Sequence, residues 1–360
     1  MKIAERLILT PHPFPLPQWT QWGEGESTHH RARLFEIGLT ALALLIFVLT
    51  SAWGQTQEYL PRKPVEKIRV TVPTKSLTFL PFYFGQDKGI FKEEGIDPEL
   101  IVMRPPLGIV ALEAGDVAYS AAPGVGMRAA LKGAPLRIVV FVQTKLSFSL
   151  VGQPGMNEKK IKTVGVSGIG STAHYAALAV MKKLGRDGPG DKVTYITTNT
   201  TAQSYTSLVS KVVDAAILSP PYTSMASLAG YTDLGDTFDI GDVQGGLVTT
   251  AKRVQEHRDQ VKAVIRGILR SLDYIAGHED EVISYLQKHF NLDRRVALGS
   301  YGILKRVFNL EGDIDEPLLK LVIDRMKKDA KITEEVPLDR IVDLSLVREA
   351  QSELKSRRRK

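Results

Sequence analysis

The sequence predicts an α/β protein made of strand–helix–strand units followed by a helical segment. Between residues 65 and 250, short apolar or β-branched runs alternate with helical stretches, and glycine follows most of those stretches. Glycine commonly ends helices, and this alternation is typical of α/β folds. After residue 250, apolar residues recur every three or four positions, which indicates amphipathic helices. The segment 112–118 also resembles 208–215, which favours two similar α/β halves.

The strand predictions rest on two kinds of pattern. Ile68, Val70 and Val72 alternate with polar residues, and Pro73 ends the run. The run 136–143 is almost continuously apolar, which indicates a strand buried on both faces. The expected strands, in order, are residues 68–72, 100–102, 117–121, 136–143, 161–166, 193–197 and 212–218. The expected helices are residues 81–88, 107–114, 127–132, 172–184, 221–229, 261–275, 282–286 and 319–326.

The N-terminal part has the order of an export signal. Residues 1–33 contain alternating prolines without periodicity, so we expect a disordered extension. In 34–54, an apolar core follows Arg31 and Arg33 and ends in Ala52-Trp53-Gly54, a small-x-small site. Cleavage would start the mature chain near Gln55, in the periplasm or at the outer face of the cytoplasmic membrane. An uncleaved membrane anchor and a buried core helix remain alternatives, because the uncharged stretch approaches the roughly 20 residues of a spanning helix.

Composition excludes several classes of function. The chain has no cysteine, which rules out disulfides, thiolate metal sites, iron–sulfur clusters and a cysteine nucleophile. The net charge is +7, but the segment 355–360 supplies five of the positive residues. We expect this basic tail to be a solvated terminus. Nucleic acid is not an expected partner, because no basic stripe with interleaved aromatics is present.

Four loops rich in serine, threonine and glycine follow expected strands: 74–79, 120–126, 167–172 and 219–222. In open α/β sheets, ligands bind at these carboxyl ends of strands. In the third loop, Ser171 suits the N-cap of a helix whose free N–H groups would attract an anion. A plain strand-to-helix turn is the alternative for this loop. His174, one turn into that helix, is either a further contact or an ordinary helix residue.

We assign no catalytic residue, no metal site and no cofactor. The histidines lie apart from the spacing of known metal motifs, and the glycine loops lack the acidic residue that a dinucleotide site needs. Lys75 is the one evident charge in the four loops, so an oxyanion head group or a neutral aromatic compound would suit them. The expected ligand-binding residues are Ser76, Thr78, Phe79, Tyr83, Ser120, Ala121, Gly170, Ser171, Thr172, Asn199, Pro220 and Tyr222.

Several short motifs occur in a family's order. They are Pro81-Phe82-Tyr83, Asp87-Lys88-Gly89-Ile90-Phe91 with Glu94-Gly95-Ile96, Ala111-Leu112-Glu113-Ala114-Gly115-Asp116-Val117, Lys162-Thr163-Val164-Gly165-Val166 with Gly170-Ser171-Thr172, and Val213-Asp214-Ala215-Ala216 with Pro220-Pro221 and Ala229-Gly230-Tyr231. From about residue 66 to 345, the chain resembles the periplasmic substrate-binding proteins of ABC importers. Within these it is similar to the nitrate, sulfonate and taurine group (SsuA-like), also described as NMT1/THI5-like. Ala118 and Lys211 depart from the family pattern at structural turns.

The resemblance implies a type II periplasmic binding protein fold, with two lobes, a hinge and a ligand cleft between them. Lobe 1 would be residues 66–153 plus 246–350, and lobe 2 residues 154–245, with crossings near 152–157 and 245–246. The implied function is delivery of a small molecule to an ABC permease by a monomer. Two alternatives on the same fold are a pyrimidine-related NMT1/THI5-like enzyme and a membrane-anchored ligand sensor; the absence of cysteine argues against the enzyme.

Overall fold

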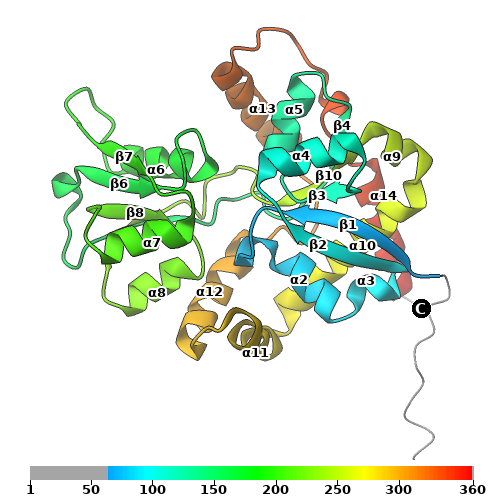
Figure 1. Ribbon diagram of the computed structural model, residues 1–360, viewed down its shortest axis with the longest axis horizontal. Coiled ribbons are helices and arrows are strands. Elements are labelled where there is room, and N and C mark those ends of the chain that lie inside the picture. Colours follow the sequence, from blue (N-terminus) through cyan, green and yellow to red (C-terminus); the bar gives the residue numbers. More distant parts are fainter. Residues whose placement is uncertain (1–63, 359–360) are drawn as a thin grey trace, which may run out of the picture. The chain divides into compact units, whose positions relative to one another are not determined.

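The computed structural model describes residues 64–358. This part of the chain contains two five-stranded sheets (Figure 1). The extension predicted for 1–33, the signal or anchor predicted for 34–54, and residues 359–360 of the basic tail lie outside the described residues. Within the described part, no helix has the length and apolar character needed to cross a bilayer.

The first sheet has the strand order β2-β1-β3-β10-β4. Its strands are β1 (Glu66–Val72), β2 (Ile96–Val102), β3 (Tyr119–Ser120), β4 (Leu136–Phe141) and β10 (Gly246–Thr250). β1 pairs in parallel with β2 and β3, while β10 runs antiparallel to β3 and β4. Five of the six β4 residues are buried, as its continuous apolar run predicts.

The second sheet has the same kind of order, β7-β6-β8-β5-β9. Its strands are β5 (Ser149–Gly152), β6 (Thr163–Val166), β7 (Thr194–Thr197), β8 (Ala215–Leu218) and β9 (Thr232–Asp236). β6 pairs in parallel with β7 and β8, and β5 runs antiparallel to β8 and β9. In each sheet, four strands therefore run in one direction and one strand, β10 or β5, runs antiparallel to both of its neighbours. This shared pattern matches the two similar halves predicted from the sequence.

Helices surround both sheets. They are α2 (Leu80–Asp87), α3 (Ile90–Glu93), α4 (Pro105–Ala114), α5 (Pro123–Leu131), α6 (Thr172–Lys183), α7 (Thr201–Val209), α8 (Tyr222–Leu228), α9 (Ala251–Glu256), α10 (Arg258–Gly277), α11 (Glu279–Phe290), α12 (Arg294–Val307), α13 (Glu316–Ala330) and α14 (Ser345–Arg358). Short 3₁₀ turns cover Leu77–Phe79, Glu158–Lys160 and Leu338–Arg340. We call the first sheet and its helices the first lobe, and the second sheet with α6, α7 and α8 the second lobe. Separate apolar clusters fill the two lobes.

The chain crosses between the sheets twice. The predicted boundary after residue 153 is wrong, because Ser149–Gly152 pairs with strands of the second sheet. The first crossing is therefore 142–148. The second runs through 237–245, between β9 and β10, and ends at the predicted glycines. Lys145 and Gly241 form an antiparallel bridge, so the two crossings lie side by side.

The predicted elements are present, with end positions that shift by a few residues. Residues 212–214 precede β8, and α5 begins at Pro123, four residues before the predicted start. The sequence missed β5, β9 and β10, because these strands are only four or five residues long and each contains glycine, which is depleted in strands. The first residues of the basic tail are part of a helix. The helix α14 continues to Arg358, and Arg357 forms an ion pair with Glu94.

Candidate functional site

The predicted ligand residues of the first lobe lie at or after the carboxyl ends of β1 and β3. Ser76 is half-buried ahead of the 3₁₀ turn that holds Thr78 and Phe79, and both of these side chains are buried. Ser120 belongs to β3 and is buried, as is Ala121. The prediction of an open loop from residue 120 is therefore wrong, since two residues separate β3 from α5.

Tyr83 lies on α2 beside a residue that the sequence did not single out, Phe290. The two rings meet edge to face with centroids 6.4 Å apart, and the Lys75 ammonium lies 5.5 Å from the Phe290 centroid. The Tyr83 hydroxyl is buried and has no hydrogen-bond partner among the described residues. Burial raises the pKa of Tyr83 to about 12, so the phenol stays protonated and can donate a hydrogen bond.

The third loop forms the helix cap that the sequence predicts. Gly170 has φ +75°, a left-handed conformation that favours glycine. Ser171 caps α6 by accepting a hydrogen bond from the His174 N–H at 3.2 Å, and its Oγ lies 3.2 Å from Ser167 Oγ. The N–H groups of Thr172 and Ala173 begin the helix and have no acceptor among residues 64–358.

The His174 side chain is hydrogen-bonded to the loop that precedes its own helix. Its Nδ1 accepts the Gly170 N–H at 3.1 Å, and its ring lies edge-on to Tyr195 with centroids 4.9 Å apart. Burial lowers the pKa of His174, so the imidazole is neutral near pH 7 and keeps Nδ1 free to accept. The Gly170 N–H is therefore already hydrogen-bonded to His174 and is not free to bind a ligand.

The two remaining loops of the second lobe lie next to each other. Asn199 follows β7 in a left-handed conformation and is exposed. The peptide between Pro220 and Pro221 is cis, and Tyr222 begins α8. The Ser219 N–H donates to Thr201 Oγ1 at 3.3 Å, which joins the loops after β8 and β7. The Tyr222 ring lies 5.6 Å from that of Tyr205.

Buried polar groups without partners add candidates that the sequence did not indicate. Gln143 is fully buried at the start of the first crossing, and both of its side-chain amide atoms lack partners in the described chain. Thr223, directly after Tyr222, has a buried Oγ1 without a partner. Unsatisfied buried groups are costly, so bound water or ligand is their usual explanation. The sole sequence signal was that Gln143 ended an otherwise apolar run.

The two lobes touch where α8 meets α12. Ser300 Oγ donates to Ser224 Oγ at 3.2 Å, and both serines are buried. Gly299 permits this approach, because a Cβ there would lie 3.2 Å from Ser224 Oγ. The contact between α8 and α12 is therefore close.

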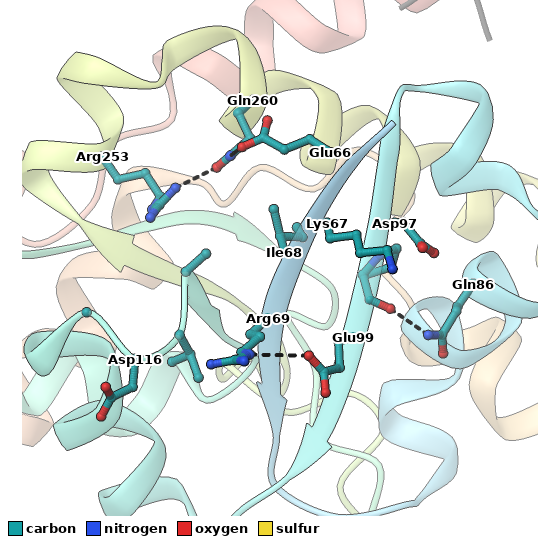
Figure 2. Close-up of a pocket in the computed structure, with 14 residues that line it drawn as sticks. Glu66, Lys67, Ile68, Arg69, Gln86, Asp97, Glu99, Asp116, Arg253 and Gln260 are labelled. Atoms are coloured by element: carbon teal, nitrogen blue, oxygen red, sulfur yellow. Dashed lines mark hydrogen bonds and ion pairs between the residues drawn. The ribbon is translucent and has the colours of Figure 1, made fainter. Parts of the chain in front are cut away.

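An open cavity of about 790 Å³ lies in the first lobe, at the end of the sheet where β1 begins. It is lined by the first residues of β1, by Gln86, and by charged side chains of both signs, as Figure 2 shows. Arg69 pairs with Glu99 there at 3.3 Å, and Arg253 donates to Gln260 at 2.8 Å. None of the predicted ligand residues lines it. The described residues contain no group of three side chains suited to a metal ion.

Comparisons with known proteins agree with this topology. A family model described as NMT1/THI5 like matches residues 76–282. No match was found among curated protein sequences. The ligand-binding component of an ABC-type import system from Staphylococcus aureus, with zinc bound, is similar at TM-score 0.63 and 18% identity, covering 79% of this chain and 99% of that one.

Two further solved structures share the fold. The alkanesulfonate-binding protein SsuA from Xanthomonas axonopodis, bound to MOPS, has a TM-score of 0.62 and 14% identity over 78% of this chain and 99% of its own. The desulfurization enzyme DSZB has a TM-score of 0.60 and 13% identity over 80% of this chain and 99% of its own. The chain therefore has the periplasmic binding protein fold, which carries binding proteins and an enzyme.

Proposed function

Since the chain belongs to the NMT1/THI5-like family, we propose that it is the extracytoplasmic solute-binding component of an ABC importer. The observation that carries this proposal is the pair of matching sheets joined by two adjacent crossings, the topology of the binding proteins that it resembles. Segment 34–54 would serve as the export signal or anchor. The partners would be a small molecule and the membrane permease, and the protein would act as a monomer.

Capture would take place between the lobes, at the carboxyl ends of the parallel strands. The crossings 142–148 and 237–245 would act as the hinge, because they are the two connections between the sheets. Closure would bring the first-lobe group around Ser76 and Tyr83 toward the second-lobe loops. Ligand exchange would then require the α8–α12 contact to open.

The residues favour a small organic anion. The N–H groups of Thr172 and Ala173, with the hydroxyls of Ser171 and Thr172, would hold an oxyanion at the positive end of α6. Tyr83 would donate its unpartnered hydroxyl from the other lobe. A sulfonate fits this set of neutral donors, and nitrate or taurine would use the same groups. Tyr222 and Tyr205 would flank the organic part of the ligand.

A thermal-shift screen of the purified chain tests the function. The panel would hold alkanesulfonates, taurine, nitrate, bicarbonate, phthalate-like aromatics and pyrimidines. A ligand at 100 times its Kd adds about 2.7 kcal/mol to stability, which gives a clear rise in Tm. A selective rise with the compound recovered unchanged supports a binding protein. Consumption of the compound would instead support an enzyme, the function of DSZB on this fold.

Replacing Ser171 by Ala together with Thr172 by Val is expected to weaken ligand binding about tenfold or more, roughly 1.4 kcal/mol, because buried ligand oxygens lose donors. Calorimetric titration of the compound found in the screen measures this. Thr250→Ala is the matched control, since Thr250 caps α9 in the same way, by accepting from the Arg253 N–H. Equal affinities in the double variant and the parent chain would remove the third loop from the site.

A further inference from the structure

A second contact joins the lobes, between α6 and α13. Tyr175 is half-buried on α6, and its hydroxyl donates to Asp329 Oδ2 on α13 at 2.7 Å. The Arg325 guanidinium, one turn earlier on α13, lies 5.6 Å from the centroid of the same ring. α6 packs on the second sheet and α13 on the first. Tyr175 of the second lobe therefore makes two contacts with the first lobe, a hydrogen bond from its hydroxyl and a cation–π contact on its ring.

Arg325 is itself fixed to the second crossing. Its Nη2 donates to Asp242 Oδ1 at 2.7 Å, and the Asp242 side chain is 4% exposed. The same carboxylate oxygen accepts the Val243 N–H. The Arg325 side chain is 33% exposed, so the cost of separation falls on the buried Asp242 carboxylate, which would lose its cation. The pair therefore holds Arg325 of α13 against the crossing. A movement of the second crossing would therefore also move α13, or would break the Arg325–Asp242 ion pair.

The tyrosine also lies close to the candidate ligand loop. α6 begins at Thr172, capped by Ser171, so Tyr175 lies about one helical turn below the N–H groups proposed to hold the anion. A rotation of the second lobe that opened the cleft would carry α6 away from α13. The Tyr175–Asp329 hydrogen bond would then break, although neither residue touches the ligand site.

We propose that Tyr175, Arg325, Asp329 and Asp242, which we name the Tyr175 clamp, set the equilibrium between closed and open lobes. Its consequence for ligand affinity rests on the proposed function, but the equilibrium itself exists without ligand. The hydrogen bond to a carboxylate is of the stronger, charge-assisted kind. We take the described arrangement, in which these inter-lobe contacts are made, as the closed state. Tyr175 is a positioning residue in this proposal: it stabilises that arrangement and leaves ligand contacts to the loops.

Distance measurements between spin labels test the clamp on the full chain without ligand. Because the chain has no cysteine, labels on Lys132→Cys and Lys192→Cys, both exposed and in different lobes, report the lobe separation alone. We expect Tyr175→Phe to lower the ratio of closed to open populations at least threefold. Asp329→Ala should lower the ratio by the same factor. The double variant should lower it no further, since each single variant and the double variant remove the same Tyr175–Asp329 hydrogen bond.

Tyr195→Phe is the matched control, because Tyr195 is a half-buried tyrosine on β7 whose ring contacts His174 of its own lobe. Its distance distribution should equal that of the parent. Asp329 is exposed, so Asp329→Ala remains interpretable even if a change at Tyr175 disturbs α6. Unchanged distributions in both variants would overturn the clamp. A shifted distribution in a chain that binds none of the screened compounds would support the clamp and count against the proposed function.

Discussion

Oxidising a Ser224→Cys, Ser300→Cys double variant is expected to slow ligand exchange by about a hundredfold or more, because exchange needs the lobes to part. The two serine Oγ atoms lie 3.2 Å apart in the structure, one on α8 and one on α12. Sulfur atoms at these positions would need little movement to reach the disulfide length of about 2.05 Å. The two helices belong to different lobes, so the bond would hold the lobes in the present arrangement.

The chain is well suited to this experiment, because it has no native cysteine to react in competition. Release of the compound identified in the thermal-shift screen would be followed after dilution, before and after adding reductant. Reductant should restore the parent rate. The single variants Ser224→Cys and Ser300→Cys control for each substitution. If mass spectrometry shows a complete cross-link and exchange stays as fast as in the parent, the lobes do not gate the ligand through this contact.

Glu94→Gln is expected to lower the free energy of unfolding by about 3 kcal/mol, since it removes one partner of a buried ion cluster. The Glu94 side chain is 1% exposed and accepts hydrogen bonds from Arg266 at 2.6 Å, Arg270 at 2.9 Å and Arg357 at 2.8 Å. These arginines come from α10 and α14. The glutamate therefore joins the chain after α3 to the long helix α10 and to the C-terminal helix α14.

Urea unfolding followed by circular dichroism measures this loss. Glu99→Gln is the matched control, because Glu99 pairs with Arg69 while both side chains are more than 60% exposed. Exposed pairs contribute about 0–1 kcal/mol, so the control should unfold close to the parent. Equal losses in the two variants would show that the buried cluster adds no more than a surface pair.

The same cluster makes stability depend on pH. Burial by itself would raise the pKa of Glu94, but the hydrogen bonds and charges of Arg266, Arg357 and Arg270 outweigh it and hold the pKa below its usual value. The contribution is therefore complete above the unfolded pKa of about 4.3 and is lost as the pH falls through the folded value. The stability difference between the parent and Glu94→Gln should shrink below about pH 4.

Local pattern was enough to predict most of the secondary structure. Alternation over residues 68–72 and the apolar run 136–143 marked strands, and glycine after residues 114 and 184 marked helix ends. The serine cap at Ser171 was predicted correctly, because capping depends on residues within one turn of each other. These features need no information from distant parts of the chain.

The sequence by itself determined the strand–helix periodicity, the loops that follow the parallel strands and the absence of cysteine chemistry. The tertiary structure alone decided that Ser149–Gly152 belongs to the second sheet, that Ser120 is buried, and which side chains join the lobes. Tyr175 and Asp329 are 154 residues apart, and Glu94 and Arg266 are 172 apart. Periodicity records which face of an element is buried, whereas such partners are chosen by where the whole fold places each element.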